Sequence, residues 1–85
     1  MKKLLAALKA AEEKANKAYD AYDAEPENEA LEKAFDKAYK KEFEAAEKLA
    51  TAICKASYGM IDMKTARTMI RVKRPELEAL IARMA

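Results

Sequence analysis

A stretch of thirty residues without Gly or Pro, at about residues 28–57, constrains this chain more than any other feature. Along it, apolar and small residues recur with alternating spacings of four and three, and Glu42 fills the one gap. This seam consists of Leu31, Phe35, Ala38, Ala45, Leu49, Ala52 and Ala56. The heptad spacing predicts one continuous helix with a single packing seam. Such a helix is about 45 Å long, so the rest of the chain must fold against it.

The N-terminal segment, at about residues 2–24, predicts a second long helix with a seam of its own. Large residues stand at both ends of that seam and alanines in its middle: Leu4, Leu8, Ala11, Ala15, Ala18 and Tyr22. Pro26 and Asn28 interrupt the two helices, because the residue before Pro avoids the α region and Asn is a good N-cap. A connection this short predicts an antiparallel helical hairpin in which Tyr22 faces Leu31.

Two short helices are predicted after the hairpin, over about residues 63–73 and 75–84. Gly59 suits the left-handed residue that ends a helix, and Asp62 suits the N-cap of the next one. Pro75 ends the first short helix and begins the second. Helices this short are not stable alone, so we expect them to pack on the open end of the hairpin. The predicted fold is therefore a single all-α domain, a long antiparallel hairpin followed by two short C-terminal helices.

Charge is unevenly distributed along the 85 residues, although the net charge is only +2. Residues 1–58 carry eleven Lys and twelve Asp or Glu, whereas residues 59–85 carry six Lys or Arg and three Asp or Glu. There is no apolar run long enough to span a membrane and no segment that resembles a signal peptide, so we expect a cytoplasmic protein. The single Cys54 allows no intramolecular disulfide, and we expect it to be a small buried apolar residue.

An enzymatic function is not expected. The chain has no His, no Gly-rich phosphate loop and no metal-ligand spacing, so we predict no catalytic residues, no metal and no cofactor. Glu42 is the one carboxylate within the seam. Helical di-metal sites pair several Glu with Glu-x-x-His motifs, which are absent here. We expect Glu42 to lean into solvent or to pair with Lys9 or Lys14.

A basic stripe is predicted on the helix that follows Gly59. Lys64, Arg67, Arg71 and Arg74 fall within an arc of about 80° on a helical wheel. Four cations on one face are consistent with weak binding to a nucleic-acid backbone or another polyanion. A solvated face and a contact with an acidic protein partner are the other two interpretations.

An aromatic cluster is the second candidate surface. Five of the six aromatic residues lie between positions 19 and 43: Tyr19, Tyr22, Phe35, Tyr39 and Phe43. The three on the longer helix recur every fourth residue, so they line one side of it. They either close the tip of the hairpin, or mediate self-association, or bind a foreign protein. We predict a homodimer held through Tyr19, Phe35, Tyr39 and Phe43, because the alanine-rich seams bury little apolar area inside one chain.

The C-terminal third resembles small uncharacterised helical proteins of gut bacteria and their phages. The similarity lies in residues 59–67, Gly-Met-Ile-Asp-Met-Lys-Thr-Ala-Arg, and residues 76–83, Glu-Leu-Glu-Ala-Leu-Ile-Ala-Arg. The resemblance implies an accessory protein that binds or inhibits a host protein, and it carries over no site residues. The predicted function is a non-enzymatic helical protein-protein interaction module, with a weak nucleic-acid-binding protein as the alternative.

Overall fold

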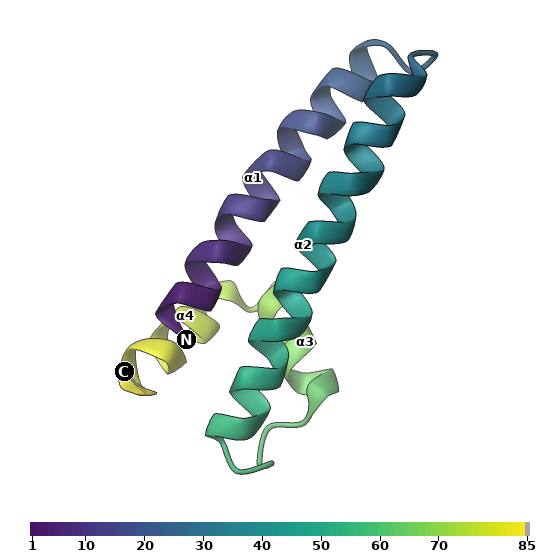
Figure 1. Cartoon of the computed structure of the whole chain (residues 1–85). Coiled ribbons are helices and arrows are strands. Elements are labelled where there is room, and N and C mark those ends of the chain that lie inside the picture. Colours follow the sequence, from purple (N-terminus) through teal and green to yellow (C-terminus); the bar gives the residue numbers. More distant parts are fainter. Residues whose placement is uncertain (85) are drawn as a thin grey trace.

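The computed structural model describes residues 1–84 and is all-α over that range (Figure 1). The four helices are α1 (Lys2–Ala24), α2 (Glu29–Ala56), α3 (Met63–Val72) and α4 (Arg74–Met84). The predicted fold class is confirmed at the level of an all-helical protein, and the helix ends differ from the expected positions by at most one residue. In this part of the chain, no helix is both long and apolar enough to cross a membrane.

The two long helices run side by side in opposite directions and give the molecule its elongated shape, 46 × 19 × 18 Å (Figure 1). The turn between them is closed by Asn28, whose Oδ1 accepts hydrogen bonds from the amides of Ala30 and Leu31 at 3.0 and 3.3 Å. The side-chain nitrogen of Asn28, Nδ2, donates to the Glu25 carboxylate at 3.3 Å. Asn28 therefore satisfies amide groups at the start of α2 that have no partner within the helix.

The chain reverses between α2 and α3 through two consecutive residues in the left-handed region. Tyr58 has a φ of 55° and Gly59 a φ of 82°, so a conformation that favours glycine is adopted by one tyrosine as well. The Gly59 amide donates to the Cys54 carbonyl at 3.0 Å, which closes the end of α2. Asp62 then caps α3 by accepting from the Thr65 amide at 2.7 Å.

All four helices contribute to one core at the open end of the hairpin, which we call the head. Its buried residues are Leu5, Leu8, Leu49, Ala50, Ile53, Ala66, Ile70, Leu77 and Ile81. Leu8, Leu49, Ile53 and Leu77 are the largest fully buried side chains. Figure 1 shows α3 beside the last turns of α2. An ion pair of 2.7 Å between Lys9 and Glu78 joins α4 to the N-terminal part of α1. Cys54 lies partly buried against this core.

The other half of the hairpin, which we call the distal half, has no comparable core. Within residues 16–44, all of which the structure describes, no side chain is fully buried. The seam residues there, among them Leu31 and Phe35, are half-buried between α1 and α2. The C-terminal helices therefore cover only the head, and no further helix covers the distal half within residues 1–84.

Candidate functional site

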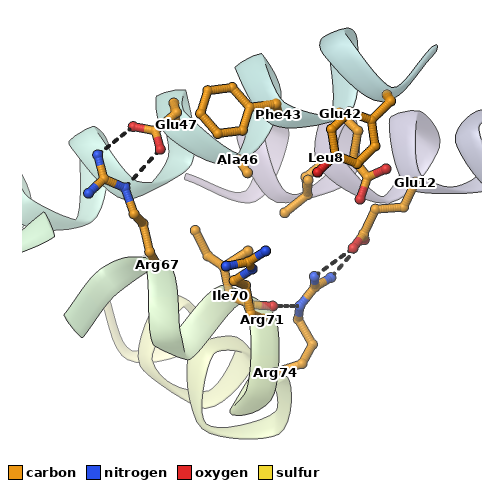
Figure 2. A pocket seen from close by; sticks show the side chains of 11 residues that line it. Leu8, Glu12, Glu42, Phe43, Ala46, Glu47, Arg67, Ile70, Arg71 and Arg74 are labelled. Atoms are coloured by element: carbon orange, nitrogen blue, oxygen red, sulfur yellow. Dashed lines mark hydrogen bonds and ion pairs between the residues drawn. The ribbon is translucent and has the colours of Figure 1, made fainter. Parts of the chain in front are cut away.

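A groove of about 340 Å³ lies where α3 crosses the hairpin, at the border between the head and the distal half (Figure 2). It is lined by Leu8 and Glu12 of α1, by Tyr39, Glu42, Phe43, Ala46 and Glu47 of α2, and by Arg67, Ile70 and Arg71 of α3, with Arg74 at the start of α4. The groove brings together members of the basic stripe and of the aromatic cluster, which were predicted as separate surfaces.

The aromatic residues divide into two groups. Phe35 is half-buried at the distal end, where its ring centroid lies 5.6 Å from Tyr19 in an edge-to-face arrangement and 6.0 Å from Tyr22 in a stacked one. Tyr39 and Phe43 line the groove and remain 55% and 60% exposed. Phe35 and Tyr22 are thus half-buried near the tip of the hairpin, whereas Tyr39 and Phe43 present open apolar area at the groove. Tyr19 is 51% exposed but does not line the groove.

Arg67 lies at one end of the groove and is bound by Glu47 of α2. Its Nε and Nη2 donate to the two carboxylate oxygens at 2.8 and 3.1 Å. These hydrogen bonds hold the pKa of Glu47 below its usual value and raise the pKa of Arg67. The pair joins α3 to α2 in a bidentate geometry, which fixes the orientation of both side chains.

Arg74 lies at the other end of the groove and is bound by Glu12 of α1. Its Nη1 and Nη2 donate to the carboxylate at 3.0 and 2.9 Å, and its Nε donates to the Ile70 carbonyl at 3.0 Å. Both side chains of the ion pair are about two-thirds or more buried, and the hydrogen bonds to Glu12 raise the pKa of Arg74. This pair ties the junction of α3 and α4 to the hairpin.

Arg71 lies between the two ion pairs, as Figure 2 shows. Among residues 1–84, it forms no ion pair with a carboxylate, and neither does Lys64. Lys64 is exposed and does not line the groove. Of the four cations predicted as a polyanion-binding stripe, two are therefore neutralised within the chain.

Glu42 points into the groove beside Glu12, not toward Lys9 or Lys14 (Figure 2). Lys9 instead pairs with Glu78 of α4 at 2.7 Å. Partial burial and the negative charge of Glu12 raise the pKa of Glu42, and the positive charge of Arg74 opposes the rise. Glu42 is therefore a half-buried carboxylate without an ion-pair partner of its own in the described chain.

A second groove, of about 550 Å³, lies between α1 and α2 on another side of the hairpin. Its lining consists of Ala7, Ala10, Ala11, Lys14, Ala34, Lys37, Ala38 and Lys41, with no carboxylate among them. Alanine side chains offer little apolar area to a partner. This groove lacks the aromatic rings and fixed ion pairs of the first one, which we therefore take as the candidate site.

Sequence reasoning missed Glu12 and Glu47 as components of the site. The signal was available in part, because carboxylates on the hairpin face that receives α3 are natural partners for an arginine-rich helix. Identifying that face requires the packing of α3, which places Arg67 and Arg74 against carboxylates 20 and 62 positions away in the sequence. Leu8, which was predicted only as a residue of the helical seam, also lines the groove.

Within residues 1–84, no group of three or more His, Cys, Asp or Glu side chains is arranged to hold a metal ion. The groove offers apolar rings, two bidentate ion pairs and two unpaired charges. Comparison of the chain with family models, curated proteins and solved structures produced no match.

Proposed function

We propose that this protein is a non-enzymatic helical protein-protein interaction module and that the groove between α2 and α3 is its binding surface. The observation that carries the proposal is the exposure of Tyr39 and Phe43 at a cavity large enough to receive side chains. Aromatic residues beside a pocket are typical anchors of protein interfaces. Arg67 and Arg74, held in place by Glu47 and Glu12, form a polar rim around them.

A second copy of the chain is the partner that we propose first. The distal half exposes apolar area that its own C-terminal helices do not cover, and its seam is rich in alanine. Two-fold pairing through Tyr39 and Phe43 buries the same patch on both copies, as in most homodimers. The same surface suits an accessory protein of bacterial or phage origin that binds or inhibits another protein.

Nucleic-acid binding is less well supported by the charges around the groove. Arg67 and Arg74 already bind carboxylates in bidentate pairs. A polyanion that reached Arg71 at the centre would also approach Glu42, which repels it. The basic stripe is thus left with two uncompensated cations, Lys64 and Arg71, for salt-sensitive contacts.

The test replaces one exposed apolar anchor by a charge and compares it with a matched surface variant. Phe43→Glu changes the groove, and Val72→Glu introduces the same charge at a residue that is 73% exposed and lies outside the groove. We expect wild type and Val72→Glu to associate in sedimentation velocity, and Phe43→Glu to remain monomeric with the same circular dichroism spectrum.

Affinity capture from a bacterial lysate, with and without nuclease, extends the test to other partners. Recovery of a protein that persists after nuclease and is lost with Phe43→Glu supports the proposal. Nuclease-sensitive recovery that is indifferent to Phe43→Glu, together with a monomeric wild-type protein, would contradict it.

A further inference from the structure

The charges of the groove divide into a paired set and an unpaired set. Three arginines and three glutamates line it, and two of each form the bidentate pairs at its ends. The remaining two are Arg71 and Glu42. Both line the same cavity, yet the structure contains no ion pair between them within 4.0 Å. The groove therefore carries one unused cation and one unused anion beside an exposed phenyl ring, that of Phe43.

Glu42 forms no ion pair or hydrogen bond with the neighbouring Arg74, whose guanidinium is directed at other acceptors. Arg74 is the cation whose charge acts on it, but both terminal nitrogens of Arg74 already donate to Glu12. The remaining nitrogen of that guanidinium, Nε, donates to the Ile70 carbonyl. Because a half-buried carboxylate beside another carboxylate is unfavourable without a donor, a cation brought from outside the chain would stabilise it.

Arg71 is a cation that lacks an anionic partner. It is exposed, has no carboxylate partner among residues 1–84, and lies between two guanidinium groups that are already neutralised. A free anion that bound to it would face the carboxylates of Glu12, Glu42 and Glu47. An acidic side chain of a partner protein binds Arg71 more favourably if the same partner also places a cation beside Glu42.

We propose that two copies of this chain pair groove to groove about a two-fold axis, with Arg71 of each copy bound to Glu42 of the other and the two Phe43 rings packed between them. This inference rests on the proposed self-association and specifies its chemistry. A second copy is the occupant that matches both charges at once, since each groove offers one guanidinium and one carboxylate. In a two-fold interface, one kind of contact is made twice, so a single complementary pair gives two ion pairs.

Charge reversal tests the proposed ion pairs more specifically than removal of a side chain, because a second reversal on the facing residue should restore the dimer. Glu42→Arg places two cations in each groove, and Arg71→Glu places two anions in each groove. Each variant alone is expected to dimerise at least tenfold more weakly than wild type, because both ion pairs become repulsive. An equimolar mixture of the two variants is expected to form a heterodimer, since every cation then faces an anion. The double variant E42R/R71E is expected to form a homodimer again.

Lys64→Glu is the matched control. It makes the same reversal on the same face of α3 but outside the groove, and it is expected to leave the dimer unchanged. Glu42→Arg also adds a cation beside Arg74, so circular dichroism must first show that each variant keeps its helices. If a reversal variant does not fold, the milder variants Glu42→Gln and Arg71→Gln replace it. Their effects on the dimer dissociation constant are then expected to be non-additive.

The outcomes separate this inference from the function on which it rests. A wild-type dimer that Phe43→Glu dissociates, but that neither charge reversal weakens, would overturn the proposed ion pairs and leave the interaction surface intact. Two reversal variants that stay apart when mixed would overturn them as well. A wild-type monomer that captures a different protein through Phe43 would overturn the two-fold pairing and still support an interaction module.

Discussion

The head and the distal half of the hairpin are built from the same two helices but are stabilised differently. In the head, α3 and α4 complete a core in which Leu8, Leu49, Ile53 and Leu77 are fully buried. In residues 16–44 nothing is fully buried, and the seam is only half-covered. A continuous heptad seam thus does not guarantee a continuous core, because two helices alone enclose only one line of side chains.

The difference between the two regions indicates where a partner protein buries the most apolar area. The core side chains of the head are already buried, although Tyr58, Met60 and Val72 around α3 are exposed. At the border, Tyr39 and Phe43 expose more than half of their surface beside a groove, so a partner can bury both at once. A partner that covers this border extends the core along the hairpin. The comparison therefore predicts that folding depends on the head and that association depends on the border.

The largest expected effect is the loss of a large side chain from the head. Leu49→Ala removes a fully buried side chain and should lower the free energy of unfolding by about 2–5 kcal/mol. Leu31→Ala, at a half-buried seam position of the distal half, should cost about 1 kcal/mol. Urea denaturation of both variants at low protein concentration measures the difference. Equal losses would show that the two halves are stabilised alike.

A smaller difference is expected between two phenylalanines eight residues apart on α2. Phe35→Ala should lower the free energy of unfolding by about 2 kcal/mol, because its ring packs against Tyr19, Tyr22 and Tyr39. Phe43→Ala should change the stability of the dilute monomer by less than about 0.5 kcal/mol, because the ring is mostly exposed. Thermal unfolding at increasing protein concentration sharpens the comparison, since only the Phe43 variant should lose the concentration dependence.

Ionisation of Glu42 should affect the stability of the fold with the opposite sign to ionisation of Glu47, Asp62 and Glu78. The pKa of Glu42 is raised, mainly by burial, so its penalty on the folded monomer is absent below the ordinary value and complete above the raised one. Glu42→Gln should therefore raise the melting temperature of the dilute monomer at pH 7. The gain should shrink as the pH falls through the pKa of Glu42.

The carboxylates of Glu47, Asp62 and Glu78 have lowered pKa values, owing first to hydrogen bonds from Arg67, Thr65 and Lys9 respectively. Their contribution to stability is present above the ordinary carboxyl value and is lost as the pH falls through the lowered one. Melting curves of wild type and Glu42→Gln between pH 3 and pH 7 check both signs. If Glu42→Gln instead lowers the melting temperature of the monomer at pH 7, Glu42 is not an unpaired carboxylate.

The smallest effect is expected for polyanions at the basic stripe. With Arg67 and Arg74 engaged, Lys64 and Arg71 remain, so the log-log salt dependence on duplex DNA should be no steeper than about −2. Fluorescence anisotropy at several salt concentrations measures the slope. A steeper slope that Arg71→Ala does not reduce would assign binding to another surface, such as the lysines of the second groove.

Local sequence signals were sufficient for the helices. The thirty residues without Gly or Pro form α2, Asn28 and Asp62 cap their helices, and the left-handed turn occurs at Gly59. These features depend on residues within a few positions of one another. The turn itself was less predictable, because Tyr58 also adopts a positive φ there.

The candidate site was less accessible to sequence reasoning because it depends on contacts between distant segments. A helical wheel places Arg67, Arg71 and Arg74 on one face, but it does not show which of them meets a carboxylate. Similarly, the four-residue spacing groups Phe35 with Phe43, although only Phe35 packs against the tyrosines of the tip. The resemblance of the C-terminal third to small bacterial and phage proteins remains a prediction.

The oligomeric state tests the central proposal most directly. Sedimentation equilibrium at about 100 µM measures the mass of the protein in solution, at a concentration at which even a dimer with a micromolar dissociation constant is mostly formed. We predict twice the mass of one chain for wild type and the mass of one chain for Phe43→Glu. A wild-type protein with the mass of a single chain at this concentration would contradict self-association through the groove.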